Sequence, residues 1–274
     1  HRWGLESPTL MRRGMNAIFR SEHTVLRVAT PNAPADVSIR LAGALDAAGI
    51  AVPTSRRDEA VVDGEFAVTA WPLLEAVDAP VDWVAVGAMV RRVHELDRAA
   101  LPAELPVPSP TDFPWWHHEQ LLGELDEYLE APAADGLRAA LDRHPGWDDF
   151  VGSDEVVVCH GDVHPGNVIM TVEGPVLIDW DLLCGAPRGW DHAPLMTWAD
   201  RWGGGANVYD DFAAGYGWSA SGDRHGEAFA ELRLVAATLM RCKASLTDPA
   251  ARPEAERRLA YWRGDSAAPV WRAQ

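Results

Sequence analysis

The sequence predicts an α+β protein with a small strand-rich lobe followed by a larger, mainly helical one. Residues 8–71 contain short runs that alternate between apolar and polar side chains, which is typical of strands. From about residue 81 the apolar residues instead recur at helix spacing. A chain of 274 residues is long enough to bury a substantial core in this arrangement.

The strand-rich lobe is predicted to have the order β-β-β-α-β-β. Residues 8–30 hold three short runs, which are broken at Gly14 and near Glu22. A helix is expected within residues 33–50, where apolar residues recur three or four positions apart. Residues 60–71 carry a hairpin signal, because Asp63-Gly64 is expected to supply the two positive-φ residues of a tight turn.

The rest of the chain is predicted to be mainly helical. Residues 82–99 place one apolar stripe on a helix, formed by Val86, Met89, Val90, Val93 and Leu96. A proline-rich loop follows, and further helices are expected near residues 119–130 and 135–143. No apolar run approaches the length of a membrane span of about 18 residues, so no membrane association is expected.

The charge distribution bounds the possible partners. The net charge of −17 argues against nucleic acid, because its phosphate backbone would be repelled. Residues 1–74 hold 8 Arg against 8 Asp or Glu, whereas residues 75–274 hold 16 Lys or Arg against 33 Asp or Glu. The first part therefore suits an anion, and the second would attract a cation or simply keep the protein in solution. Three cysteines at unrelated spacings fit neither a disulfide framework nor a zinc site, so a reducing cytoplasm is the expected location.

The stretch "VCHGDVHPGNVIMTVEGPVLIDWD", residues 158–181, holds two polar clusters around an apolar hairpin. Asn167 and Asp179 offer oxygen ligands that suit Mg²⁺, which takes the rest of its shell from water and phosphates. Asp162 lies upstream on the same loop, where it is free to accept a proton from a hydroxyl nucleophile. A base that orients the nucleophile, together with a carboxylate-held metal, is the division of roles in phosphoryl transfer.

These clusters resemble the catalytic loop ("HGDVHPGN") and the metal-binding segment ("IDWD") of the aminoglycoside phosphotransferase and choline kinase family, which are small-molecule relatives of the protein kinases. The resemblance covers roughly residues 8–245. It implies transfer of the γ-phosphate of ATP or GTP to a hydroxyl group of a small molecule. In this family Asp162 would be the catalytic base, and Asn167 and Asp179 would be the Mg²⁺ ligands.

The resemblance also implies a bilobal protein-kinase-like fold, with a five-stranded antiparallel sheet and one helix in the N-lobe and a mainly helical C-lobe. The nucleotide-binding lobe would span residues 1–74, with a hinge near 69–74, and the catalytic and substrate-binding lobe would span 75–274. The backbone near Ala70 and Trp71 would meet the nucleotide base. In "GWDHAPL", Asp191 would brace the catalytic loop from behind.

The sequence departs from the family pattern in the N-terminal lobe. The third strand of such kinases offers a Lys to the nucleotide phosphates, but residues 1–74 contain no Lys, and Arg27 stands at the matching position. A guanidinium can grip phosphates bidentately, although its reach and geometry differ from those of an ammonium. The helix Glu that pairs with this Lys is replaced by Ser38, so the ion pair is either missing or rebuilt. The glycine-rich loop "RRGMNAI" retains one glycine, and Gly14 and Asn16 are assigned to the nucleotide.

The acceptor is expected to be small and cationic, such as an aminoglycoside or another antibiotic, or an amino alcohol. Two tryptophan-rich segments, residues 115–119 and 196–202, combine flat apolar faces with acidic groups, which suits a cationic or sugar-like molecule. The candidate acceptor residues are Glu119, Trp198, Asp200 and Trp202.

Two other interpretations are open on the residues alone. One is a metal-dependent phosphoester hydrolase, because the mixed nitrogen and oxygen ligands of this stretch could bind a transition metal, namely His160, Asp162, His164, Asp179 and Asp181. The other is a nucleotide-binding kinase-like module without turnover, since the family's Lys and Glu are both replaced. The strand-rich lobe argues against the hydrolase, and the retained catalytic and metal-binding residues argue against the inactive module.

Overall fold

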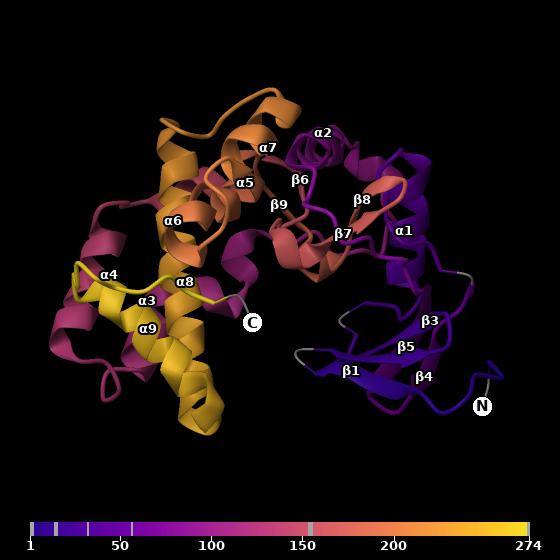
Figure 1. Ribbon diagram of the computed structural model, residues 1–274, viewed down its shortest axis with the longest axis horizontal. Helices are drawn as coiled ribbons and strands as arrows, with labels where there is room; N and C mark the ends of the chain where they lie inside the picture. Colours follow the sequence, from indigo (N-terminus) through magenta and orange to yellow (C-terminus); the bar gives the residue numbers. More distant parts are fainter. Residues whose placement is uncertain (1–2, 14–15, 32, 56, 153–155, 273–274) are drawn as a thin grey trace.

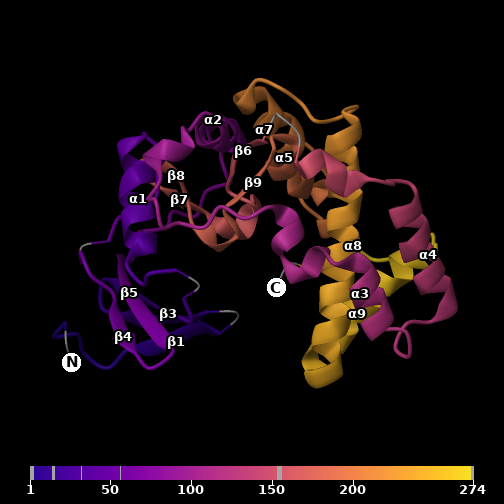
Figure 2. The same ribbon diagram turned by 180° about the vertical axis from the view of Figure 1, so that it is seen from behind.

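The chain folds into two lobes. The computed structural model describes residues 3–13, 16–31, 33–55, 57–152 and 156–272. A sheet with one helix forms one side of the molecule, and a group of helices forms the other (Figure 1). The view from behind shows the same separation (Figure 2). This is the bilobal α+β arrangement that the sequence predicts.

The sheet of the N-terminal lobe has five antiparallel strands in the order β1-β2-β3-β5-β4. Its strands are β1 (Thr9–Arg13), β2 (Ala17–Ser21), β3 (Thr24–Ala29), β4 (Val61–Asp63) and β5 (Phe66–Pro72). Helix α1 (Val37–Ala47) lies between β3 and β4 in the chain and buries Val37, Leu41 and Leu45. The predicted order β-β-β-α-β-β is confirmed.

The β4–β5 hairpin forms where it is predicted, but its turn is displaced by one residue. Asp63 pairs with Phe66, so the two central turn residues are Gly64 and Glu65 rather than Asp63 and Gly64. Gly64 has a φ of 59°, whereas Asp63 stays in the strand. A glycine at the first central position is the pattern of a type II′ turn, which needs only one residue in the left-handed region.

The C-terminal lobe is built around one long central helix. Its helices are α2 (Trp83–His94), α3 (His118–Glu124), α4 (Ala131–Asp142), α5 (Gly189–Met196), α6 (Trp198–Trp202), α7 (Val208–Tyr216), α8 (Arg224–Thr247) and α9 (Arg252–Trp262). Helices α3 and α4 depart from the predicted bounds. Helix α3 is expected near residues 119–130 but ends at Glu124. Helix α4 is expected near 135–143 but begins at Ala131, because Pro132 fits the first turn of a helix. Among the helices of the described residues, none combines the length and the apolar character needed to cross a membrane.

The two lobes share one hydrophobic core behind the site. Leu41 and Leu45 of α1 belong to the same buried cluster as Val86 of α2 and Leu177, which lies two residues before Asp179. The Leu177 N–H also donates to the Ala51 carbonyl at 3.0 Å. The strand that presents the candidate metal ligand is therefore packed directly against the N-terminal lobe.

Candidate active site

Two short antiparallel ribbons hold the two polar clusters next to each other. Strand β6 (Val156–Cys159) pairs with β9 (Cys184–Pro187), and Cys159 lies opposite Cys184. Strand β7 (Val168–Thr171) pairs with β8 (Gly174–Leu177), and Val168 lies opposite Leu177. The loop 160–167 joins β6 to β7, and the segment 178–183 joins β8 to β9. The strand residues that flank one loop are therefore paired with the strand residues that flank the other. For this reason the two polar clusters lie close together although they are apart in sequence.

Asp191 on α5 braces the start of this loop, as the sequence predicts. Its fully buried carboxylate accepts the backbone N–H groups of His160 and Gly161, both at 2.8 Å. Gly161 has a φ of 89°, and a β-carbon there would meet the Leu182 carbonyl oxygen at 1.9 Å. The loop therefore needs a glycine at this point and a carboxylate behind it.

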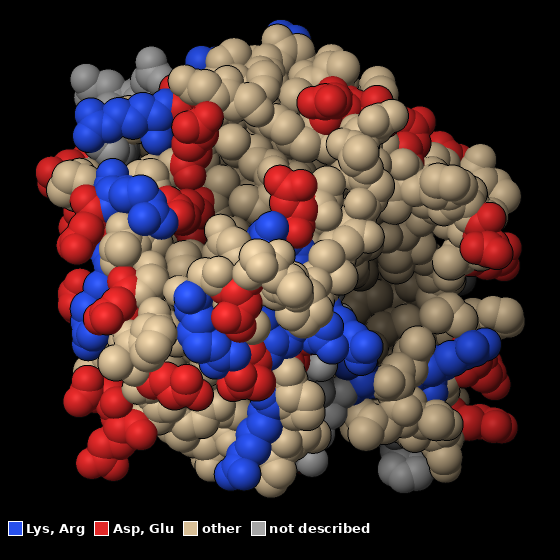
Figure 3. Space-filling view, turned by 60° about the vertical axis from the view of Figure 1, so that its left-hand side comes forward, with Lys and Arg blue, Asp and Glu red and all other residues tan. Residues whose placement is uncertain are grey.

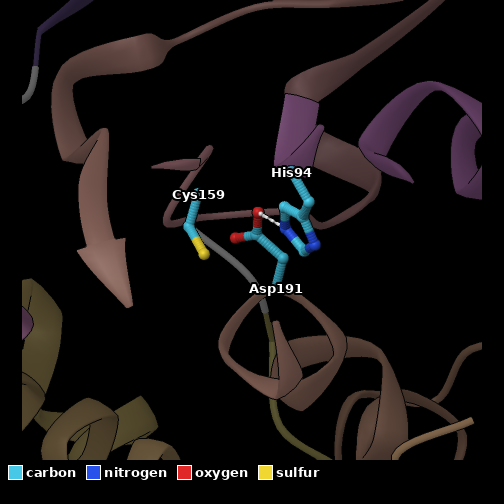
Figure 4. A group of neighbouring side chains, drawn as sticks. All are labelled: His94, Cys159 and Asp191. Carbon is cyan, nitrogen blue, oxygen red and sulfur yellow. Dashed lines mark hydrogen bonds and ion pairs between the residues drawn. The ribbon is translucent and has the colours of Figure 1, made fainter. Parts of the chain in front are cut away.

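His94 extends this brace into the helical lobe. Its Nε2 lies 3.0 Å from Asp191 Oδ2, and its Nδ1 lies 2.8 Å from the Tyr216 hydroxyl. Figure 4 shows His94, Asp191 and Cys159 grouped closely enough to suggest a metal site. However, both ring nitrogens and both carboxylate oxygens already have hydrogen-bond partners, and burial raises the pKa of the Cys159 thiol. The group is thus a buried support for the loop.

The hydrogen bonds of the two loop histidines assign both as neutral rings. The N–H of Asp162 points to His160 Nδ1 at 3.2 Å, and the N–H of Gly166 points to His164 Nδ1 at 3.0 Å. A ring nitrogen that accepts carries no proton, so in each ring the proton is assigned to Nε2. His160 then donates to the Ile178 carbonyl at 3.1 Å, and burial lowers its pKa. His160 is therefore a scaffold between the two clusters.

The carboxylate of Asp162 is partly exposed and has three side-chain partners, which are Arg233, His164 and Asn167. Arg233 of α8 donates from Nη2 to Asp162 Oδ1 and to the Gly161 carbonyl, the latter at 3.0 Å. His164 Nε2 lies 3.3 Å from Asp162 Oδ2. Burial alone would raise the pKa of Asp162, but the hydrogen bond to His164 and the charge of Arg233 outweigh it and hold that pKa well below its usual range. The carboxylate is therefore ionised at neutral pH and fixed in orientation.

Asn167 and Asp179 have the donor atoms expected of a Mg²⁺ site. The buried Asn167 donates from Nδ2 to the carbonyl of Asp162 at 2.9 Å and to its Oδ2 at 3.2 Å, which directs the amide oxygen away from that residue. The exposed Asp179 has a left-handed φ of 64°. Reduced hydration and the negative charge of Asp181 raise the pKa of Asp179. Such crowding of oxygens and negative charge favours a divalent cation.

The alternative transition-metal set does not assemble in the described part of the chain. His160 is committed to the Ile178 carbonyl, and Asp181 is bound by Arg27 and Asn16. The His94, Cys159 and Asp191 group is the one acidic, imidazole or thiol cluster of metal-site dimensions among the described residues. The contacts therefore give no support to the hydrolase interpretation.

The predicted phosphate-binding residues meet the metal-binding segment rather than α1. Arg27 Nη2 donates to Asp181 Oδ1 at 2.6 Å, and Asn16 Nδ2 donates to Asp181 Oδ2 at 2.6 Å. Gly14, the other residue predicted for this loop, lies outside the described residues. Strand β3, the β1–β2 loop and the segment after β8 thus come together at one carboxylate.

The predicted hinge residues lie at the end of β5. Ala70 is buried, and its carbonyl accepts the Ser55 hydroxyl at 2.6 Å. Trp71 is partly exposed, and its indole N–H donates to the Thr69 hydroxyl at 2.9 Å. In the β3–β5 ladder Thr69 is paired with Arg27. The end of β5 is therefore beside the strand that carries the predicted phosphate ligand.

An aromatic stack leads away from the catalytic loop along α6. The rings of His164 and Trp198 lie 5.8 Å apart and nearly parallel, and those of Trp198 and Trp202 lie 5.5 Å apart. Asp200 is exposed on the same helix. Glu119 is exposed on α3, and no hydrogen bond or ion pair of the described residues joins it to this stack. The structure brings together Trp198, Trp202 and the loop, but not Glu119.

Arg233 is the residue that the sequence analysis missed. It lies on α8 and is separated from Asp162 by 71 positions in the chain. The available signal was a single arginine within the otherwise apolar run "LRLVAATLM" of the central helix. An arginine at such a position needs a partner for its charge, which here is the Asp162 carboxylate.

The surface charge differs between parts of one face of the molecule. Figure 3 shows a face with a hollow to the right of its centre, where Lys and Arg side chains border the lower edge. Asp and Glu side chains are spread over other parts of this face. The acidic excess of the chain is therefore not uniform over the surface.

A β-rich lobe, a braced loop with Asp162 and Asn167, and a following Asp179 together define a phosphotransferase of the protein-kinase-like class. The model of the phosphotransferase enzyme family (APH) matches residues 16–234, so the chain belongs to this family. It is a kinase of small molecules. The comparison with curated proteins gave no match.

Solved structures of this class have the same fold. Aminoglycoside 2′-phosphotransferase-IIIa in its GDP complex is similar with a TM-score of 0.71, 12% identity, and coverage of 96% of this chain and 94% of that one. Spectinomycin phosphotransferase in complex with ADP and spectinomycin is similar with a TM-score of 0.69 and 16% identity, and the match covers 94% of this chain and 89% of that one. A choline/ethanolamine kinase family protein from Mesorhizobium loti gives 0.63, 19%, 96% and 89%. At these identities the similarity establishes the fold.

Proposed function

We propose that the protein transfers the γ-phosphate of ATP or GTP, in a Mg²⁺-dependent reaction, to a hydroxyl group of a small acceptor. The observation that carries this proposal is the contact between Asp162 and Asn167 on one loop. The end of that loop is hydrogen-bonded to the segment that contains Asp179. Asn167 donates to Asp162, and the Ile178 N–H donates to the Asn167 carbonyl at 3.0 Å. ADP and GDP in the structures of two similar proteins leave both nucleotides as candidates.

Asn167 and Asp179 would hold the cation, since Asn167 donates through Nδ2 and keeps its amide oxygen as a ligand, and the negative charge of Asp181 adds to the carboxylate of Asp179. A Mg²⁺ ion held by these residues would supply neutralisation of the charge on the phosphates. We assign the phosphates to the side of the site where Asn16 and Arg27 lie, and the nucleotide base to the end of β5 near Ala70 and Trp71. This assignment follows the order of the elements around the site.

Asp162 is the proposed catalytic residue. Its low pKa makes it a weak base, so its main task is to accept a hydrogen bond from the acceptor hydroxyl and aim that oxygen at the phosphorus. In a loose phosphoryl-transfer transition state the acceptor hydroxyl gives up its proton late, after most of the bond between the γ-phosphorus and the leaving oxygen has broken. A weak base is therefore sufficient. Arg233 and Asn167 hold the carboxylate so that little reorganisation is required.

The acceptor is proposed to bind on the side of Asp162 occupied by His164. There the stacked, partly exposed rings of Trp198 and Trp202 lie on α6, and Asp200 provides a negative charge on the same helix. Such a surface suits a cationic or sugar-like molecule, for example an aminoglycoside, another antibiotic or an amino alcohol. The three cysteines are free and buried, which is compatible with the reducing cytoplasm that we propose as the location.

The test begins with a thermal-shift screen of such acceptors with Mg²⁺ and a non-hydrolysable nucleotide, followed by turnover assays on any compound that shifts the melting temperature. Asp162→Ala should then lower kcat by about a thousandfold or more while nucleotide affinity stays within a few fold. Asp210→Asn, on the exposed side of α7, serves as a matched control that keeps wild-type kinetics. Full phosphorylation by Asp162→Ala would refute the assignment, and Asp162-dependent turnover would exclude the inactive module.

A further inference from the structure

The phosphate-binding strand has an ion-pair partner in an unexpected element. We propose that Asp181, two residues after the metal ligand Asp179, anchors Arg27 and so replaces the helix carboxylate that usually holds the β3 cation in kinases. This inference rests on the proposed function, because it concerns how the same site grips its nucleotide. It assigns Asp181 as a positioning residue that acts through Arg27, and not as a second metal ligand.

Helix α1 provides no carboxylate for Arg27. Its N-terminal Asp36 accepts from Arg40 at 3.0 Å, and Arg40 also pairs with Glu104 at 2.8 Å. The other acid of this helix, Asp46, is exposed near its C-terminal end. Within the described ranges the ion pair of Arg27 is with Asp181, and the two side chains are 23% and 32% exposed. The missing helix Glu is therefore compensated from the opposite lobe.

The geometry leaves Arg27 able to bind phosphate while it is anchored. Both contacts to Asp181 use the same nitrogen, Nη2, toward the two carboxylate oxygens. A guanidinium has five N–H donors, so those of Nη1 and Nε remain for phosphate oxygens. A lysine has a single nitrogen that would have to serve both the carboxylate and the phosphate. The replacement of Lys by Arg and the relocation of the acid therefore fit one another.

Asn16 makes the same carboxylate a junction of three elements. It reaches Asp181 from the start of β2, at the end of the β1–β2 loop. Arg27 also lies close enough to Asp179 for its positive charge to oppose the rise in the pKa of that carboxyl. The loop above the phosphates, the strand cation and the metal-binding segment are thus fixed relative to one another through Asp181.

A binding experiment on the whole chain tests this without an acceptor. Isothermal titration with MgADP, and in parallel MgGDP, is performed on the wild type, Arg27→Met, Asp181→Asn and the double variant. We expect Arg27→Met to weaken binding about thirtyfold and Asp181→Asn about fivefold. In the Arg27→Met background the second change should cost less than about twofold, because Asp181 acts through Arg27. Asp63→Asn, an exposed acid of the same lobe, is the matched control and should bind normally.

Each other outcome overturns the inference. Tighter binding by Asp181→Asn would mean that the ion pair is a latch that the nucleotide must break. An equal loss in the wild-type and Arg27→Met backgrounds, or a raised Mg²⁺ requirement with unchanged nucleotide affinity, would mean that Asp181 contacts metal or phosphate directly. If the folded wild type binds neither nucleotide, the proposed function itself fails. Circular dichroism of each variant verifies that its fold is intact.

Discussion

The loop that carries Asp162 and the strand that carries Arg27 are held in two different ways. Behind the loop, Asp191 is fully buried and accepts hydrogen bonds from His160, Gly161 and His94. Arg27 of β3 and Asp181, after β8, instead pair between two elements with both side chains partly exposed. Charge-assisted hydrogen bonds in a buried setting contribute about 1.5–3 kcal/mol each, whereas exposed ion pairs contribute about 0.2–1 kcal/mol.

This difference matches the proposed roles of the two sides. In the proposed reaction the acceptor hydroxyl and Asp162 would need one geometry in the transition state, which a buried network can maintain through every turnover. The pair of Arg27 and Asp181 would instead position the guanidinium for the nucleotide phosphates, and its partial exposure limits how much it contributes to stability. Variants on the two sides should therefore have effects of different size and kind.

Among the residues that support the two sides, the largest effect is expected from Asp191→Asn. The amide keeps the shape of the side chain but turns an NH₂ group toward N–H donors, so that buried groups lose their partners. We expect turnover to fall about a hundredfold or more and the free energy of unfolding to fall by about 3 kcal/mol. Steady-state kinetics and urea unfolding measure both, and wild-type stability in this variant would contradict the proposed brace.

The same variant allows a check on the pH dependence of stability. Burial would raise the pKa of Asp191, but the hydrogen bonds that it accepts from His94 and from the Gly161 N–H lower it, and the net shift is downward. A carboxyl group with a lowered pKa stabilises the folded state above its unfolded pKa of about 4. This stabilisation is lost as the pH falls toward the folded pKa. The stability difference between the wild type and Asp191→Asn should therefore shrink below about pH 4.

A smaller effect is expected from Arg233→Met, which removes the hydrogen bonds of the guanidinium to Asp162 and to the Gly161 carbonyl. We expect kcat to fall about tenfold while nucleotide affinity changes less than about twofold. The pKa of Asp162 should rise, so the acid limb of the kcat profile should move to higher pH. Arg233→Lys should restore part of the rate, and Arg241→Met on the same helix should have no effect. An unchanged pH profile would show that Arg233 is only a packing residue.

The sequence predicts the features that depend on neighbouring residues. Local patterns along the chain predict the element order of the N-terminal lobe, the apolar stripe of α2, and the spacing of Asp162, Asn167 and Asp179. The structure has the predicted strands and helices at these positions. The brace by Asp191 is also predicted, because the family motif fixes its position. Local errors are small: the hairpin turn is displaced by one residue, and α4 begins earlier than expected.

The pairings that complete the site are not predictable in this way. Arg27 and Asp181 are separated by 154 positions, and Arg233 and Asp162 by 71. Each pair forms only because separate elements pack together, so a pattern read along the chain contains no record of it. What the sequence does contain is a deficit: a strand without Lys, a helix without Glu and an arginine within an apolar helix. Such deficits indicate that a partner exists elsewhere, although they do not identify it.

The smallest effect is expected from Arg27→Lys, which restores the usual residue of the family without restoring its helix carboxylate. The ammonium keeps the positive charge but has only one nitrogen. It therefore lacks the separate Nη1 and Nε groups that would reach the phosphates while Asp181 is bound. We expect the affinity for MgADP to fall about threefold and kcat at saturating nucleotide to stay within about twofold. Arg12→Lys, on the exposed strand β1, is the control and should match the wild type. If Arg27→Lys instead bound nucleotide more tightly, a single nitrogen would suffice for both partners, and the fit between Arg27 and the relocated acid would lose its physical basis.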